Sequence, residues 1–406
     1  MSLEEPELSI PEIKFTLRLG HPDFRDLPWE LPLEQWQGVC PRLEEAPRGL
    51  TRHPVVFVNY DGVLYTLKEM PAHQAEREYQ LLTQIETLRI PVVTPVGYVN
   101  IRTSKDNTGV LVTRYLEHSI PYRSLFMTGN LVRYREHLLD AIAGLLVQTH
   151  MVGIYWGDCS LSNTLFRRDA GALQAYLVDA ETAEIKPERT PAYLRHQDLD
   201  IMEDNVDGEL AALAASGILS GGFPAHENGI YIRLRYQRLW DEITQEEVIG
   251  PSESLRIQER IRALNALGFS VGGIEFYKAP KGEQIRLRVL VTDRNFHRDQ
   301  LFSLTGLEAE EMQARLMMNE IHEVRATLSQ ANQRSTPLSV AAYHWMVNVY
   351  QPVIQRLQPL IDKDMNLAEL YFQVLEHKWY LSEKARRDVG HNDAVEDYVH
   401  NIAKLN

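Results

Sequence analysis

The sequence predicts an α+β protein in which an antiparallel sheet comes first and helices predominate afterwards. Residues 55–70 contain two β-rich runs that flank Asp61-Gly62, a dipeptide that strongly favours a tight hairpin turn. Residues 134–150 carry apolar side chains at helical spacing, and residues 165–178 hold two short apolar runs around a polar turn, which predicts a second hairpin. Helical patterns then dominate the C-terminal part of the chain.

Length, composition and charge exclude several classes of protein. A chain of 406 residues with 44% hydrophobic and 24% charged residues is typical of a globular protein of two or three domains. The net charge of −14 argues against nonspecific nucleic-acid binding, which rewards Lys and Arg. The two cysteines lie far apart in the sequence, and the acidic N-terminus has no signal pattern, which together favour a cytoplasmic protein. No run approaches the ~18 apolar residues of a membrane span, so we expect no transmembrane segment.

The first 46 residues are rich in proline and acid. Trp29 and Trp36 lie among prolines that restrict the backbone and interrupt helices. We interpret residues 1–46 as an arm that packs on the main domain through its tryptophans. A linear segment that binds a partner is the alternative.

The most informative stretch runs from Leu145 to Glu181. It places Asp158, Asn163 and Asp179 on loops and strand ends around the second predicted hairpin. Phosphoryl transfer needs a carboxylate to orient or deprotonate an attacking hydroxyl, and hard oxygen ligands for Mg²⁺. Asp158 suits the first role, and Asn163 and Asp179 suit the second. The alternative is that these residues are ordinary turn and strand-end residues.

The spacing of these residues resembles that of the protein-kinase-like superfamily. Asp158 is followed by Asn163 after four residues and then by Asp179 at the end of the next hairpin strand. The segment His150–Asp158, of the form His-x-x-Gly-Ile-x-x-Gly-Asp, is similar to that of bacterial small-molecule and lipopolysaccharide-type kinases. The resemblance implies a bilobal fold with a small antiparallel N-lobe sheet and a mainly helical C-lobe. Two positions depart from the family pattern: Trp156 replaces the usual His, and Ala180-Glu181 follows the metal-binding Asp.

The same resemblance implies the nucleotide-binding parts of the N-lobe. Lys68, late in the second strand, is expected to contact the α- and β-phosphates of ATP and to be held by Glu78, with Glu76 as the alternative partner. The segment 47–53 stands where a glycine-rich phosphate loop is expected but has a single glycine, so Arg48 and Arg52 are candidates to supply positive charge there. Residues 110–116 are expected to lead into the hinge that meets adenine.

These features predict four segments. They are an arm at 1–46, an N-lobe at 47–117, a C-lobe with the catalytic loop at 118–222, and an α+β, mostly helical C-terminal domain at 223–406, where a Gly-Gly-Phe-Pro stretch marks the boundary. In this last domain we expect helices near 231–240, 253–267, 308–330, 337 onward and 367–380, and strands at 269–277 and 284–291. The domain resembles one of unknown function that accompanies such kinase-like modules in bacteria, and it is a candidate site for a protein partner.

The sequence therefore favours an ATP- and Mg²⁺-dependent phosphotransferase. The acceptor stays open between a small-molecule hydroxyl, a lipid-linked sugar and a protein. One alternative is a nucleotide-binding pseudokinase that acts as a switch or scaffold. The other is a kinase-fold enzyme that transfers AMP rather than phosphate.

Overall fold

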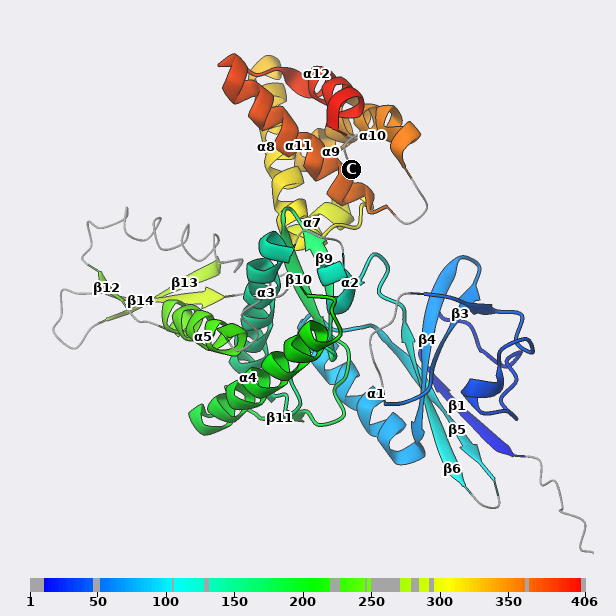
Figure 1. Ribbon diagram of the computed structural model, residues 1–406. Coiled ribbons are helices and arrows are strands. Elements are labelled where there is room, and N and C mark those ends of the chain that lie inside the picture. The colour runs from blue at the N-terminus through cyan, green and yellow to red at the C-terminus, as the bar shows by residue number, and fades with distance from the viewer. Residues whose placement is uncertain are drawn as a thin grey trace, which may run out of the picture. The chain divides into compact units, whose positions relative to one another are not determined.

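The fold is described here from a computed structural model (Figure 1). Two compact units are formed, the first from Met1–Arg167 and Ala175–Leu239 and the second from Arg168–Gln174 and Trp240–Asn406. The structure describes residues 11–46, 52–103, 106–127, 131–219, 227–244, 247–249, 271–278, 285–291, 296–361 and 365–402. The domain boundary expected after residue 222 stays a prediction, and the two units divide at Leu239 and Trp240.

A six-stranded antiparallel sheet forms the N-terminal part of the first unit (Figure 1). Its strand order is β1-β5-β6-β4-β3-β2, so that β4, which carries Lys68, is paired on both sides. The strands are β1 (Glu12–Leu17), β2 (Leu43–Glu44), β3 (Val55–Tyr60), β4 (Val63–Pro71), β5 (Pro95–Arg102) and β6 (Asn107–Arg114). Sequence analysis did not identify β1 or β2, which complete the two edges.

The hairpin predicted at Asp61-Gly62 is confirmed. β3 and β4 pair from Val55 opposite Lys68 to Tyr60 opposite Val63. Both turn residues have positive φ, 54° at Asp61 and 86° at Gly62. Two consecutive positive φ values match the turn that suits the twist of paired strands, and Asp-Gly tolerates this conformation well.

Helix α1 (Ala72–Thr87) packs against β5 and β6. Its buried residues recur every three or four positions, which gives one continuous face: Ala72, Ala75, Glu78, Leu82 and Ile85. Full burial of Leu82 or Ile85 contributes about 1.5–3 kcal/mol each. Glu78 is the one charged member of this face, and its partner is part of the site described below.

The N-terminal arm packs on the sheet through its aromatic residues, as the sequence predicts. Trp29 and Trp36 are 3% and 0% exposed and form an edge-to-face pair with centroids 5.4 Å apart. Each indole N–H donates to an arm carbonyl, at 2.7 Å to Phe24 and 3.0 Å to Leu31. The two rings belong to a core that includes buried side chains of β3, β4, β5 and β6. The arm is therefore an integral part of the first unit.

Replacing Trp36 by alanine is expected to destabilise the first unit by about 3–5 kcal/mol, because a fully buried indole leaves a large cavity. Equilibrium denaturation followed by circular dichroism measures the change. Trp379→Ala is the matched control, since Trp379 is 66% exposed. A midpoint for Trp36→Ala equal to that of the control would contradict the packing described here.

The remainder of the first unit is mainly helical. Helix α3 contains the run predicted at 134–150, and a three-stranded sheet of order β10-β9-β7 contains the second predicted hairpin. The elements that lie wholly or mostly in this unit, or in the hairpin that extends from it, are β7 (Ile120–Pro121), α2 (Tyr122–Met127), α3 (Leu131–Met151), β8 (Ile154–Tyr155), β9 (Thr164–Asp169), β10 (Ala172–Leu177), β11 (Glu184–Ile185), α4 (Ala192–Ala215) and α5 (Asn228–Thr244). The predicted α+β class, with a small antiparallel sheet followed by a helical lobe, is confirmed.

The second unit contains a small antiparallel sheet and a helical part. The strands expected at 269–277 and 284–291 are present as β13 and β14, and the helix expected at 253–267 lies outside the described residues. Two tyrosines and a tryptophan, Trp345, Tyr350 and Tyr371, are packed in the helical core. The elements are β12 (Glu247–Ile249), β13 (Val271–Lys278), β14 (Ile285–Val291), α7 (Phe296–Thr305), α8 (Glu311–Asn332), α9 (Leu338–Trp345), the π-helical turn η3 (Met346–Tyr350), α10 (Gln351–Leu357), α11 (Leu367–Ala385) and α12 (Gly390–Asp397).

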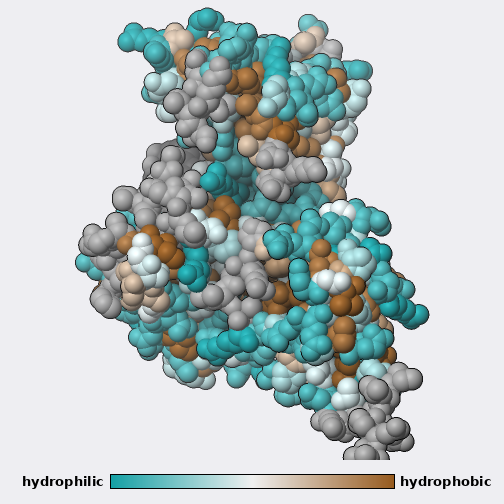
Figure 2. All heavy atoms as spheres, turned by 45° about the vertical axis from the view of Figure 1, so that its right-hand side comes forward, coloured by the Kyte–Doolittle hydropathy of each residue, from teal (hydrophilic) through white to brown (hydrophobic). Residues whose placement is uncertain are grey.

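Hydrophobic side chains are also visible on the surface of the helical part of the second unit (Figure 2). Val340, Tyr343 and Val347 are exposed at intervals of three and four residues and therefore lie on one side of α9 and η3. None of the helices among the described residues is long and apolar enough to cross a membrane. The protein partner expected for the C-terminal region stays a prediction.

The tip of the β9–β10 hairpin, Arg168–Gln174, belongs to the second unit, and Asp169 makes a buried contact within that unit. Its carboxylate accepts the backbone N–H groups of Met312 and Gln313, at 3.2 and 2.9 Å, and so caps the start of α8. Burial raises the pKa of Asp169 to about 7, the nearby Glu310 carboxylate adds to this rise, and the two N–H groups oppose it. The ionised form of this side chain is thus disfavoured in the folded protein.

The pKa of Asp169 predicts that the second unit becomes less stable as pH rises. The pKa of this carboxyl is about 3.9 in the unfolded chain and about 7 in the folded protein. Between these two pH values the carboxyl is protonated in the folded protein and ionised in the unfolded chain. Stability is therefore lost between about pH 4 and pH 7, by up to about 4 kcal/mol. Thermal unfolding from pH 4.5 to 7.5 tests this. The stability of Asp169→Asn relative to the wild type is expected to increase with pH, and parallel curves would contradict the assignment.

Candidate active site

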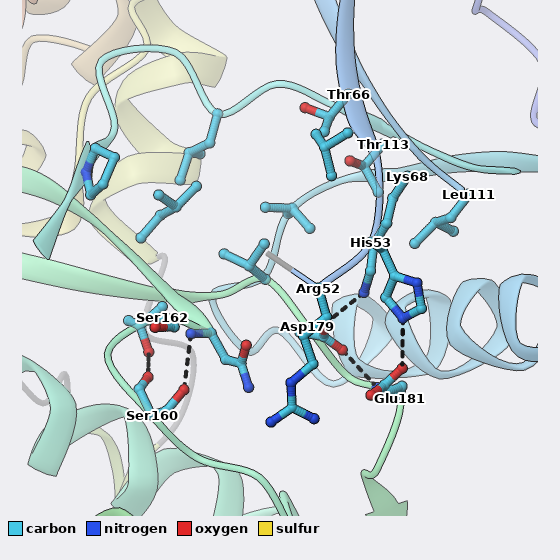
Figure 3. A pocket seen from close by; sticks show the side chains of 18 of the residues that line it. Arg52, His53, Thr66, Lys68, Leu111, Thr113, Ser160, Ser162, Asp179 and Glu181 are labelled. Atoms are coloured by element: carbon cyan, nitrogen blue, oxygen red, sulfur yellow. Dashed lines mark hydrogen bonds and ion pairs between the residues drawn. The ribbon is translucent and has the colours of Figure 1, made fainter. Parts of the chain in front are cut away.

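A cavity of about 500 Å³ lies in the first unit and brings the predicted polar residues together. This volume is in the range of small-molecule and cofactor sites. Lys68, Glu78, Asp158, Asn163, Asp179 and Arg52 all line it. Figure 3 shows Lys68 and Asp179 turned toward each other and His53 turned toward Glu181. Arg48 lies outside the described residues.

Asp158 and Asn163 lie on the loop between β8 and β9 and contact each other. The amide nitrogen of Asn163 donates to Asp158 Oδ2 at 3.1 Å and to the Asp158 carbonyl at 2.9 Å. These bonds fix the tip of the loop and occupy the NH₂ end of the amide. The amide oxygen of Asn163 is then the atom of this side chain suited to a cation.

The start of the loop is held by a buried aspartate from α4. Asp198 is fully buried and accepts the backbone N–H groups of Trp156 and Gly157 at 2.8 and 2.7 Å. Gly157 has a φ of 81°, and a Cβ there would lie 3.1 Å from the carbonyl oxygen of Thr182, so only glycine adopts this turn without strain. Although Trp156 stands where the family pattern has His, Asp198 still holds the backbone of the loop through these two hydrogen bonds.

A buried histidine completes the support of this loop. His150 Nε2 lies 2.9 Å from Asp198 Oδ2, and His150 Nδ1 lies 2.8 Å from the hydroxyl of Tyr236. Burial lowers the pKa of His150, although Asp198 opposes the change. A neutral ring that donates from Nε2 and accepts at Nδ1 satisfies both contacts. His150, which the sequence analysis quoted only as part of a pattern, thus orients Asp198.

Asp179 follows β10 and faces the same cavity. The N–H of the preceding Val178 donates to the carbonyl of Asn163 at 3.1 Å, which pairs the backbone next to Asp179 with that of Asn163 at the base of the hairpin. The indole N–H of Trp156 donates to the Asp179 carbonyl at 3.1 Å. Trp156, in place of the usual His, therefore links the loop that carries Asp158 and Asn163 directly to the segment that carries Asp179.

Lys68 bridges two carboxylates. Its ammonium lies 2.6 Å from Asp179 Oδ2 and 3.2 Å from Glu78 Oε2, and Glu78 is fully buried on α1. Glu78 rather than Glu76 meets Lys68, and Glu76 lies instead near Gln80. The ammonium is thus held between the sheet, α1 and the segment after β10.

Burial and neighbouring charges both shift the pKa values of Glu78 and Lys68. Burial raises the pKa of Glu78, as does the negative charge of Asp179, while Lys68 opposes the rise. Burial alone would lower the pKa of Lys68, but the two carboxylates outweigh it and raise the pKa. Lys68 therefore stays charged and supplies the positive charge that two neighbouring carboxylates require.

Basic side chains also reach the cavity from the segment before β3. Arg52 is exposed and lines the cavity, and His53 Nε2 lies 4.0 Å from Glu181 Oε2 (Figure 3). Sequence analysis named Arg52 as a source of positive charge and assigned no role to His53 or Glu181. The cavity also has an apolar wall that includes Val55, Leu111 and Leu116, beside the expected hinge.

The residues present fit a divalent cation held by hard oxygen ligands. Oxygens of Glu78, Asp179 and Glu181 lie within 4.8 Å of one another, and Asn163 lies across the hairpin base from Asp179. Carboxylate and amide oxygens are the donors that Mg²⁺ prefers.

Sequence analysis did not identify three residues that support the loop between β8 and β9. Asp198, Asn205 and Glu209 lie on α4 at intervals of seven and four, which places them on one side of the helix. Asn205 donates to the carbonyl of Cys159, and Glu209 accepts the N–H of Leu161. Their regular spacing was the available signal.

Comparison with known proteins finds family matches for two parts of the chain. Residues 62–212 match the lipopolysaccharide kinase (Kdo/WaaP) family. This part is a kinase-like module. Residues 238–403 match DUF4032, a domain of unknown function, so the suspected pairing of a kinase-like module with such a domain is confirmed. The match supports kinase-like phosphotransfer chemistry with nucleotide use in this module.

Two further comparisons provide no argument about function. A solved structure described as WaaP in complex with acyl carrier protein is 17% identical, with a TM-score of 0.36, over 63% of this chain and 99% of that chain. Among curated proteins no match is found.

Proposed function

We propose that the kinase-like module transfers the γ-phosphoryl group of ATP to a hydroxyl, with Mg²⁺ as the cation. The observation that carries this proposal is the convergence of Lys68, Asp158, Asn163 and Asp179 on one cavity of about 500 Å³. These four side chains come from β4, the loop before β9 and the segment after β10, separated by up to 111 positions. A structural role alone would not require these polar groups to line a single cavity.

In this proposal each side chain has one task. Asp158 accepts the hydrogen bond of the acceptor hydroxyl and takes its proton as the new P–O bond forms and the bond to ADP breaks. Lys68, positioned by Glu78, binds the α- and β-phosphates. Asn163 and Asp179 hold Mg²⁺, which neutralises phosphate charge when bound. Arg52 supplies further positive charge at the mouth of the cavity, the role also expected of Arg48.

The nature of the products tests this function. Purified full-length protein is incubated with Mg²⁺ and ATP, and ³¹P NMR follows the nucleotide. Formation of ADP that requires Asp158 is the expected result, with water as acceptor if no other is present. AMP with pyrophosphate would instead show nucleotidyl transfer. Mg-dependent nucleotide binding without either product under a range of hydroxyl acceptors would indicate a pseudokinase.

A labelling experiment identifies the class of hydroxyl compound that accepts the phosphoryl group. Incubation with radiolabelled γ-phosphate ATP and cell extract, followed by separate analysis of lipid, small-molecule and protein fractions, distinguishes the three classes left open by the sequence. Label that appears in one fraction with the wild type and not with Asp158→Asn identifies the class. The C-terminal region is the candidate for binding a protein partner, and its exposed apolar residues support this role.

A further inference from the structure

One side of α4 contacts the catalytic loop along its length. Asp198, Asn205 and Glu209 are separated by seven and four residues, close to two turns and one turn of helix. Asp198 holds the N–H groups at the start of the loop, at 2.7 and 2.8 Å. The other two residues bind different parts of the loop, and each has a defined set of partners.

Asn205 contacts the carboxylate of Asp158. Its amide nitrogen lies 3.0 Å from the carbonyl oxygen of Cys159 and 3.4 Å from Asp158 Oδ1. Because an amide nitrogen has two hydrogens, one can be directed to each oxygen. The bond to Cys159, a fully buried residue, fixes the direction of the amide. The other carboxylate oxygen of Asp158 receives Asn163 at 3.1 Å. Each oxygen of Asp158 therefore faces one amide, which defines the plane of the carboxylate.

Glu209 contacts the part of the loop that precedes Asn163. Its two oxygens accept the N–H groups of Leu161 at 2.8 Å and of Ser162 at 3.0 Å, and the hydroxyl of Ser162 also donates to it. Burial raises the pKa of Glu209, and these three donors oppose the rise. Ser160, next to this pair, accepts the N–H of Asn163 at 3.1 Å. The backbone that carries Asn163 is thus fixed by contacts from α4.

We propose that Asn205 and Glu209 are positioning residues that divide the control of the site between them. Asn205 sets the orientation of Asp158 toward the acceptor hydroxyl, and Glu209 sets the position of Asn163 toward the cation. This inference rests on the proposed phosphotransfer. It assigns α4 a role in catalysis in addition to its role in the core.

The two roles predict different kinetic signatures. Asn205→Ala is expected to lower kcat about tenfold to a hundredfold with KM for ATP unchanged, because misplacement of a catalytic group acts on the chemical step. Asn205→Asp is expected to lower kcat further, since it places a second carboxylate beside Asp158 and the Cys159 carbonyl. Glu209→Ala is expected to raise the Mg²⁺ concentration for half-maximal rate at least fivefold. Glu209→Gln, which still accepts an N–H, is expected to recover part of this loss.

Matched controls and a measurement without turnover complete the test. Asp204→Ala changes an exposed neighbour on α4 and is expected to leave both parameters within twofold of the wild type. Crystal structures of the wild type and Asn205→Ala report on Asp158 directly. The variant is expected to show a rotated or split Asp158 carboxylate with the Asp198 contacts retained.

The outcomes separate this inference from the proposed function. An unchanged Asp158 rotamer in Asn205→Ala, or the same loss of kcat and the same Mg²⁺ dependence in the Asn205 and Glu209 variants, would overturn the division of roles. If the wild type forms no ADP, the proposed function fails, and the crystal structures still decide whether Asn205 orients Asp158.

Discussion

Replacing Asp158 with asparagine is expected to lower the rate of phosphoryl transfer by about two to four orders of magnitude, the range that a positioned general base contributes. The substitution preserves the shape of the side chain and removes its ability to take a proton. The amide oxygen can still accept from Asn163, which contacts Asp158 at 3.1 Å, while the new NH₂ group replaces the oxygen that faces Asn205 at the longer distance of 3.4 Å. Because Asp198 still holds the backbone at the start of the loop, the loop is expected to keep its structure. Steady-state assay of ADP formation measures the change.

The control for this experiment is a second acidic residue of the same unit. Asp204 is exposed on α4, and Asp204→Asn is expected to retain the wild-type rate. Binding of a nonhydrolysable ATP analogue with Mg²⁺ is expected to be equal in Asp158→Asn and the wild type, since Asp158 is assigned to the acceptor. Retention of more than a third of the wild-type rate by Asp158→Asn would remove Asp158 from the role of base.

Replacing Asp179 with alanine is expected to abolish the dependence of nucleotide binding on Mg²⁺ and to weaken binding by about a hundredfold. The carboxylate is a ligand type that Mg²⁺ prefers, and Mg²⁺ is generally held by one or two carboxylates together with substrate phosphates. The variant also removes one of the two carboxylates beside Lys68, at 2.6 Å. Isothermal titration of the ATP analogue, with and without Mg²⁺, measures the effect.

Variants of two nearby glutamates serve as controls for the Asp179→Ala experiment. Glu184→Gln changes an exposed residue of β11 and is expected to bind nucleotide as the wild type does. Glu181→Gln changes a residue whose oxygen lies within 4.8 Å of those of Asp179 and Glu78. A modest loss in Glu181→Gln, less than about a tenth of that in Asp179→Ala, is expected. Equal losses would move the cation away from Asp179, and an Mg²⁺-dependent Asp179→Ala would refute the assignment.

The sequence predicted those parts of the site that depend on local pattern. The Asp61-Gly62 turn fixes the register of β3 and β4, and this register determines which face of the sheet Lys68 occupies. The short segment from Asp158 to Asp179 places three polar residues around a single hairpin. Local geometry alone therefore brings these residues near one another, and the roles assigned to them stay predictions.

The supporting residues could not be predicted in the same way because their partners are distant in the sequence. Asp198 meets the N–H of Trp156 across 42 positions, and Asn205 meets Asp158 across 47. Helix α4 buries Asp198 together with Leu199 and Met202, so its apolar and polar faces are poorly separated. Its polar residues therefore resembled those of any surface helix. Strand β1 carries a local signal, since polar and apolar residues alternate in Glu12–Leu17 as they do in a half-buried strand, but it lies in the proline- and acid-rich segment that we interpret as an arm.

The burial of the N-terminal arm bears on how the kinase-like module can be excised. A fragment limited to residues 62–212, the extent of the family match, would lack the arm together with β1, β2 and β3. Val58 and Tyr60 would be removed, and the side chains of Tyr65, Leu67 and Val112 would be left facing solvent. Strand β4 would also present an unpaired edge, and exposed apolar faces and open strand edges both promote aggregation. Soluble fragments for biochemistry therefore need to retain the chain from residue 12 onward.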